Sequence, residues 1–78
     1  MAIHHEFTFG TTRCRIHVTA HEGPGSRDVA YVANVFLSAT GDDVVDHAGR
    51  PIELHRSTEQ AALDAMIARV AFKFGPRT

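Results

Sequence analysis

The spacing of apolar residues changes once along this chain of 78 residues, and that change limits the folds open to it. In the runs up to His55, apolar and polar side chains alternate, which is the period of a half-buried strand. From Ser57 to Phe74 apolar residues recur every three or four positions, as on an amphipathic helix, and Gly75-Pro76 ends that pattern. We therefore expect an α+β fold: an antiparallel meander of three or four strands, with one C-terminal helix packed on one face.

The first two alternating runs predict a β-hairpin over residues 3–9 and 12–21. Gly10-Thr11 between them suits a two-residue turn of the primed type, which needs glycine's positive φ. The register that this turn sets places mostly apolar pairs inward and the following pairs outward: Thr8 with Arg13, Glu6 with Arg15, and His4 with His17. A polar Gly/Pro segment after His21 predicts a loop.

Residues 29–39 predict the third strand. Asn34 and Ser38 share one parity, so that parity should face outward and carry Val32 and Phe36 with it. The inward set is then Val29, Tyr31, Ala33, Val35 and Leu37. Residues 40–43 should turn the chain, Val44-Val45 should regain a short pairing, and residues 52–55 should close the sheet with Ile52 and Leu54 inward.

The helix over residues 57–74 should be apolar in two directions. Ser57 followed by Gln60 predicts a capping box at its start. At about 100° per residue, one arc that should cover the sheet comprises Leu63, Met66, Ile67, Val70 and Phe74. A second arc comprises Ala61, Ala65, Ala68 and Phe72. A two-layer domain needs one buried stripe only, so the second arc predicts a homodimer interface, as do the outward Val32 and Phe36 on the sheet.

Composition limits the class of protein. The length suits a single domain over residues 1–78. The one cysteine, Cys14, allows no intrachain disulfide, and no apolar run approaches the ~18 residues of a membrane span. Since no signal peptide is evident at the start, we expect a protein of the bacterial cytoplasm. The formal charge of -1 argues against a chain built mainly to grip nucleic acid.

The six histidines suggest a catalytic or metal site, but their expected positions predict a non-catalytic protein without cofactor or metal. His4 and His17 should oppose each other on the outer face, and two imidazoles supply only half of a tetrahedral site. Cys14 should face the helix as a core residue. Asp42-Asp43 and Asp46 lack the ligand alternation of a calcium loop and are expected to be turn residues.

Two function classes remain open. The first is a small interaction or regulatory module that self-associates, with a protein partner possible. The second is a module that binds single-stranded nucleic acid, because cations around an exposed ring on the outer sheet face can bind phosphates while the ring stacks on a base. That face would comprise His4, Arg13, Arg15, His17, Phe36 and His55, with Glu6 and Glu53 among them. Protonation of its histidines below about pH 6 should make it clearly basic.

Two family resemblances appear at the junction of sheet and helix. Tyr31-Val32-Ala33 followed by Ser57-Thr58-Glu59-Gln60-Ala61-Ala62 resembles the core of HicB-like antitoxins, in which a Thr-x-Glu-Glu-Ala stretch opens the helix. The Pro-x-Leu-Pro-Gly segment and DNA-binding extension of that family are missing. The layout is also similar to the second half of double-stranded-RNA-binding domains, but Thr58-Glu59 stands where that family has phosphate-contacting lysines. The chain also resembles small bacterial sheet-plus-helix domains of unknown function. These resemblances imply the fold rather than an activity.

Overall fold

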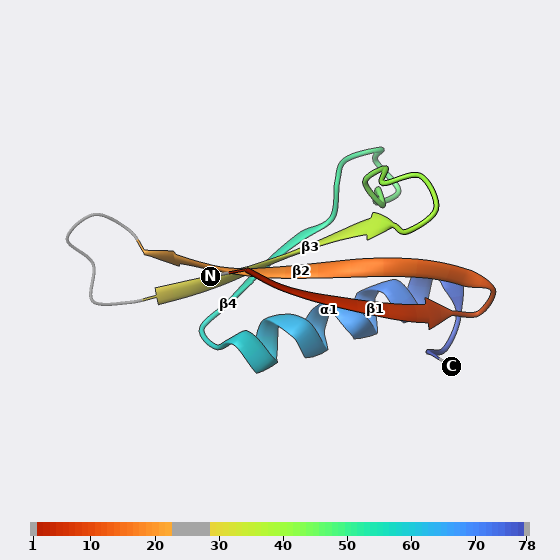
Figure 1. Cartoon of the computed structure of the whole chain (residues 1–78). Coiled ribbons are helices and arrows are strands. Elements are labelled where there is room, and N and C mark those ends of the chain that lie inside the picture. The colour runs from red at the N-terminus through yellow and green to blue at the C-terminus, as the bar shows by residue number, and fades with distance from the viewer. Residues whose placement is uncertain (1, 23–28, 78) are drawn as a thin grey trace.

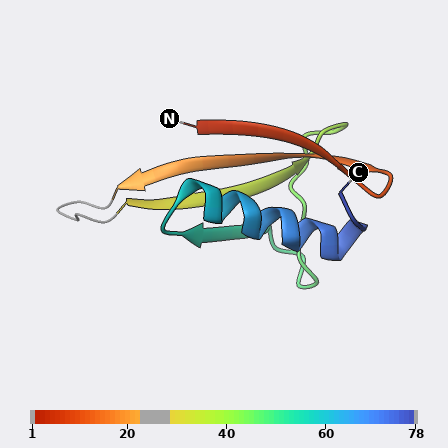
Figure 2. The same ribbon diagram turned by 90° about the horizontal axis from the view of Figure 1, so that it is seen from below.

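One antiparallel sheet and one helix make up the described part of the chain. The computed structural model describes residues 2–22 and 29–77, with only the backbone of residues 2, 3, 22 and 29. Its elements are β1 (Ala2–Phe9), β2 (Thr12–Glu22), β3 (Val29–Leu37), β4 (Glu53–Arg56) and α1 (Glu59–Phe74). The strands lie in the order β1-β2-β3-β4, and each neighbouring pair is antiparallel. Because α1 lies along one face of this sheet, the predicted α+β meander is confirmed (Figures 1 and 2).

The hairpin of β1 and β2 has the register that the sequence predicts. Its pairs run from Phe9 opposite Thr12 at the turn to His4 opposite His17, and on to Ala2 opposite Thr19. Gly10 has a φ of 61°, whereas no described residue other than glycine has a positive φ. A positive φ at the first turn position alone is the pattern of a type II′ turn, whose twist matches that of the flanking strands.

The core lies between the inner face of the sheet and α1. Alternate residues of the central strands are fully or almost fully buried there, which confirms the predicted inward parity of β3 at Ala33 and Val35. Tyr31 and Leu37 pack against the same cluster, whereas the side chain of Val29 lies outside the described residues. The buried cluster comprises Phe9, Cys14, Ile16, Val18, Ala33, Val35, Val44, Ile52, Ala62, Met66 and Val70.

The start of α1 differs from the prediction. The N-cap is Thr58, whose side-chain oxygen accepts a hydrogen bond from the amide of Ala61 at 3.1 Å. Ser57 therefore lies outside the helix, and Gln60 donates to Asp64 instead of closing a capping box. Either hydroxyl suits a cap, and the choice depends on where β4 ends, which the local sequence does not determine.

The face of α1 against the sheet is also centred differently. Ala62, Met66 and Val70 are its buried residues, at a spacing of four. The predicted residues Leu63, Ile67 and Phe74 are only partly buried beside them. Ala62 was missed because a small side chain carries little weight in a hydrophobic pattern. Its size lets the first half of the helix approach the sheet closely.

The segment between β3 and β4 returns to the core before β4 begins. Val44 donates to the carbonyl of Val35, which confirms the expected short pairing, and Ile52 donates to Val44. Both Val44 and Ile52 are buried. Between them, the side chain of Asp46 accepts hydrogen bonds from the amides of Ala48 and Arg50 and closes a turn. This turn and α1 line a common hollow.

After α1 the chain returns to the first hairpin. Gly10 donates a backbone hydrogen bond to the carbonyl of Pro76 at 3.0 Å, and Phe9 forms an isolated bridge with Arg77. The guanidinium of Arg77 lies 5.0 Å from the centre of the Phe7 ring, which places a cation over the inner edge of β1. Within the described residues, no helix has the length and apolar character needed to cross a membrane.

Candidate functional site

The outer stripe of α1 is the first candidate surface; it comprises Ala61, Ala65, Ala68 and Phe72. At about 100° per residue these four positions fall within an arc of about 60° on the side of α1 turned away from the sheet. Ala61 and Ala65 are half-buried, Ala68 is exposed, and Phe72 exposes 87% of its surface. Phe72 therefore buries little of its surface against the described residues of its own chain.

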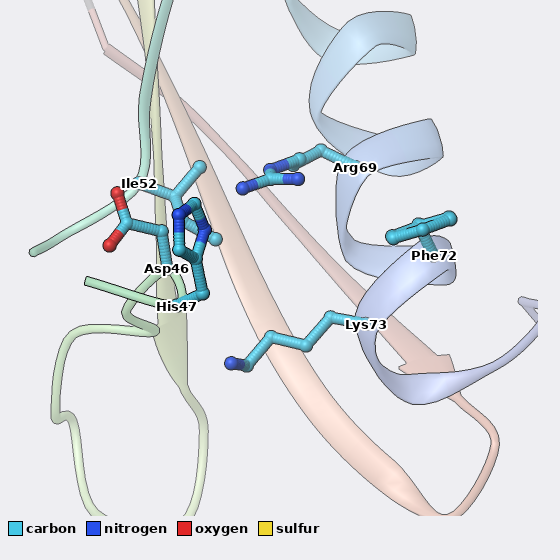
Figure 3. A pocket seen from close by; sticks show the side chains of 6 residues that line it. All are labelled: Asp46, His47, Ile52, Arg69, Phe72 and Lys73. Carbon is cyan, nitrogen blue, oxygen red and sulfur yellow. The ribbon is translucent and has the colours of Figure 1, made fainter. Parts of the chain in front are cut away.

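Beside the outer stripe, the helix and the turn of the 46–52 segment enclose a hollow of about 190 Å³. Ile52 lies in the wall of the hollow towards the sheet. Phe72, the last residue of the outer stripe, lies at the rim of the hollow on α1, away from His47 (Figure 3). Arg69 and Lys73 extend from α1 towards the ring of His47 on the opposite side (Figure 3). This basic hollow connects the outer stripe to the turn, and it was not predicted.

The outer face of the sheet is the second candidate surface. The predicted outward residues do share this face, and they form rows across neighbouring strands. In one row Glu6, Arg15 and Phe36 lie side by side. Arg13 donates through Nε to Oε2 of Glu6 at 2.7 Å, and Arg15 donates through Nη2 to Oε1 at 3.0 Å. These two bonds lower the pKa of the Glu6 carboxyl, that from Arg15 contributing most. One carboxylate therefore offsets part of the charge of both arginines.

Three rings form a continuous contact across β1, β2 and β3. The ring centres of His4 and His17 lie 4.1 Å apart with the rings nearly perpendicular, and His17 lies 4.8 Å from Phe36. Nε2 of His17 is buried in this arrangement and has no hydrogen-bond partner within the described residues. Burial, together with the nearby His4 and Arg15, lowers the pKa of His17. The fold therefore favours the uncharged form of this imidazole.

The remaining outward residues lie towards β4. Val32 pairs with His55, and Nε2 of His55 lies 2.6 Å from Oε1 of Glu53. Two shallow hollows accompany these rows. One of about 250 Å³ is lined by Arg15, His17, Phe36, Leu37, Ser38 and Gly41. The other, of about 370 Å³, is lined by Thr19, His21, Val32, Asn34, Glu53 and His55.

The structure gives Cys14 and the acidic turn residue Asp46 the structural surroundings that the sequence predicts. Cys14 is buried, and burial raises the pKa of its thiol, which suits a core residue rather than a nucleophile. Backbone hydrogen bonds from Arg50 and Ala48 contribute to a lowered pKa of Asp46. The same hydrogen bonds close the turn, so this carboxylate stabilises the local backbone. Among the described residues, no group of three or more His, Cys, Asp or Glu side chains could hold a metal ion.

Comparison of the chain with protein-family models, with curated proteins and with solved structures found no match. The resemblances given above therefore rest on their quoted residues alone. What the chain can do has to be argued from the outer stripe, the basic hollow and the outer sheet face.

The residues of the basic hollow carried a weak signal in the sequence. Arg69 and Lys73 are four residues apart, so they had to lie on one flank of the helix. Their counterpart His47 lies in a turn, and only the long-range placement of the 46–52 segment brings it to that flank. Local patterns carry no information on such placement.

Proposed function

We propose that this protein is a small non-catalytic interaction module that self-associates through the outer stripe of α1. The observation that carries the proposal is the exposure of Phe72, 87% of its surface, at one end of a row of alanines. Burying one such ring on association contributes about 2 kcal/mol, and a symmetric dimer buries two.

The order of residues along the outer stripe favours an antiparallel pair of helices. Counted from the point midway between Met66 and Ile67, Ala65 and Ala68 lie at equal distances on opposite sides, and so do Ala61 and Phe72. A two-fold axis through that point would put Phe72 of one copy over Ala61 of its partner. The largest side chain of the stripe would thus meet a small one, which lets the helix axes approach to about 8 Å.

The size of the outer stripe predicts a weak dimer. Ala61 and Phe72 are about 16 Å apart along the helix axis at 1.5 Å per residue. A contact of that length belongs to the small end of protein interfaces. We therefore expect monomer and dimer to exchange with concentration, as suits a regulatory contact. The free, buried thiol of Cys14 is compatible with a reducing compartment, and the bacterial cytoplasm is the location that we propose.

Sedimentation equilibrium over a range of concentrations tests this proposal. Wild type should show a monomer–dimer equilibrium, and Phe72→Glu should be monomeric because a carboxylate would be buried in the apolar contact. Two matched variants place a glutamate elsewhere: Val45→Glu at the other large apolar side chain that is exposed among the described residues, at 36%, and Phe36→Glu on the outer sheet face. Both should dimerise as wild type does. A monomeric wild type, or a dimer lost only in Phe36→Glu, contradicts the proposal.

A nucleic-acid-binding module is the second candidate, favoured by the Phe36 ring beside the hollow that Arg15 and His17 line. The charges weigh against it at neutral pH, because Glu6 binds both Arg13 and Arg15. Titration with a single-stranded oligonucleotide at low salt tests it. Salt-sensitive chemical-shift changes at Arg13, Arg15 and Phe36, enlarged in Glu6→Gln, would support binding, whereas no change in either protein would end this candidate.

A further inference from the structure

We propose that the basic hollow between α1 and the 46–52 segment binds a phosphate group through Arg69, Lys73 and His47. This inference goes beyond the dimer, because its three ligand side chains lie outside the outer stripe. It starts from two cations that the fold holds on the same side of one helix, facing a third nitrogen-bearing group.

Neither Arg69 nor Lys73 forms an ion pair with any of the side chains that the structure describes, those of residues 4–21 and 30–77. The charge of Arg69 is nevertheless close enough to Asp46 to contribute to the lowered pKa of that carboxyl. The amine of Lys73 lies 5.8 Å from the centre of the Phe74 ring. Two like charges four residues apart on a helix repel each other, so the pair destabilises α1 slightly unless an anion binds between them.

One acidic residue lines the hollow, and its hydrogen bonds lie elsewhere. Oδ1 of Asp46 accepts from the amides of Ala48 and Arg50, and its carboxylate points away from α1 (Figure 3). The hollow thus has two positive side chains and one negative side chain, before any protonation of His47. Its excess of positive charge favours an anion.

The shape of the hollow limits the anion to a small group. Its volume of about 190 Å³ is below the ~300 Å³ of the smallest usual pockets for whole cofactors. A guanidinium presents two parallel N–H groups that match two phosphate oxygens, and an ammonium can bind a third. Arg69 and Lys73 together supply this pattern, and a ring nitrogen of His47 can donate from the opposite side.

The surroundings strengthen such contacts. Ile52 is buried at the wall of the hollow, and Arg69 is half-buried, so water is partly excluded from the guanidinium. In the monomer, where no partner covers Phe72, its ring lies at the rim, and an aromatic group attached to the phosphate could stack against it. The phosphate could therefore be free inorganic phosphate or part of an aryl phosphate ester. Stacking on Phe72 would make the ester bind more tightly than free phosphate.

Heteronuclear NMR titration at constant ionic strength tests the proposal, with inorganic phosphate in one arm, phenyl phosphate in another and chloride as the reference. We expect saturable shifts at Arg69, Lys73 and His47 in both phosphate arms. Tighter binding of phenyl phosphate would identify an ester as the preferred source, and equal binding would identify free phosphate.

Matched variants locate the binding site. Lys73→Gln removes an exposed charge without disturbing the core. Arg69→Lys keeps the charge but removes the two parallel N–H groups of the guanidinium. Each substitution should weaken phosphate binding about tenfold. Arg56→Gln changes an exposed arginine on β4 and should bind as wild type does. The same should hold for Ala68→Glu, which disrupts the outer stripe but does not line the hollow, so loss of the dimer leaves phosphate binding measurable. Linear shifts equal to those with chloride, or equal affinity in Lys73→Gln and Arg56→Gln, would overturn the proposal.

Discussion

Gly10 of the first hairpin lies directly against the carbonyl group of Phe74 at the end of α1. A Cβ atom built on Gly10 would come within 2.5 Å of that oxygen, closer than real Cβ contacts allow. Gly10 also has a φ of 61°. One residue thus serves the hairpin turn and the docking of the helix end, which joins the two ends of the fold.

Gly10→Ala should therefore destabilise the protein for two reasons. The left-handed backbone costs a residue with a side chain about 1–3 kcal/mol, and the clash with a backbone atom adds to that cost. Gly41→Ala is the matched control, since Gly41 has a φ of 76° and nothing within 4 Å of a built Cβ. Chemical denaturation should give a clearly larger loss for Gly10→Ala. Equal losses would mean that the contact with Phe74 does not constrain the fold.

The helix cap gives a second comparison. Thr58→Ala removes the oxygen that accepts from the amide of Ala61 and should cost about 1 kcal/mol in the free energy of unfolding. Ser57→Ala lies one residue outside the cap and should change that free energy little. Urea denaturation of both variants measures the difference. The reverse order of effects would restore Ser57 as the cap.

His17 should make stability depend on pH in the mildly acidic range. Its pKa in the folded state lies below the ordinary value of 6.5, because burial, His4 and Arg15 all disfavour the charged ring. Below about pH 6.5 the unfolded chain therefore binds this proton more readily, and the free energy of unfolding falls until the pH is below the folded-state pKa.

Denaturation at a series of pH values checks this, with His17→Asn compared with wild type. The variant should show a smaller loss of stability between about pH 7 and about pH 5. His21→Asn, at an exposed histidine outside the contact of His4, His17 and Phe36, serves as the control and should follow wild type. The Glu6 carboxyl, whose pKa is lowered from 4.5, loses its contribution only at lower pH, so the two effects separate. An unchanged profile in His17→Asn would contradict the assignment.

The sheet was predictable because its signals are local. Gly10-Thr11 fixed the turn, alternation on both sides fixed the register, and the parity of Asn34 and Ser38 oriented β3. Packing details depend on residues far apart in the chain, and there prediction failed. Ala62 was missed as a core residue, and nothing near Pro76 indicated that its carbonyl would accept a hydrogen bond from Gly10.

Some features of the candidate surfaces were likewise predictable from local sequence, and others were not. Ala61, Ala65, Ala68 and Phe72 were predictable because helical periodicity alone places them on one side of α1. The outward position of His4, His17 and Phe36 followed from register and parity. Sharing of Glu6 by Arg13 and Arg15 depends on side-chain conformation, and the basic hollow depends on where the 46–52 segment packs. The first has no local sequence signal, and the only local signal of the second is the four-residue spacing of Arg69 and Lys73.

The most direct test of the self-association surface is an isotope-filtered NOE experiment on a mixture of labelled and unlabelled protein. The antiparallel arrangement predicts intermolecular NOEs from the Phe72 ring to the methyl group of Ala61, and between the methyl groups of Ala65 and Ala68. Intermolecular NOEs confined to Val32 and Phe36 on the outer sheet face would contradict it, and so would their complete absence at concentrations where sedimentation shows a dimer.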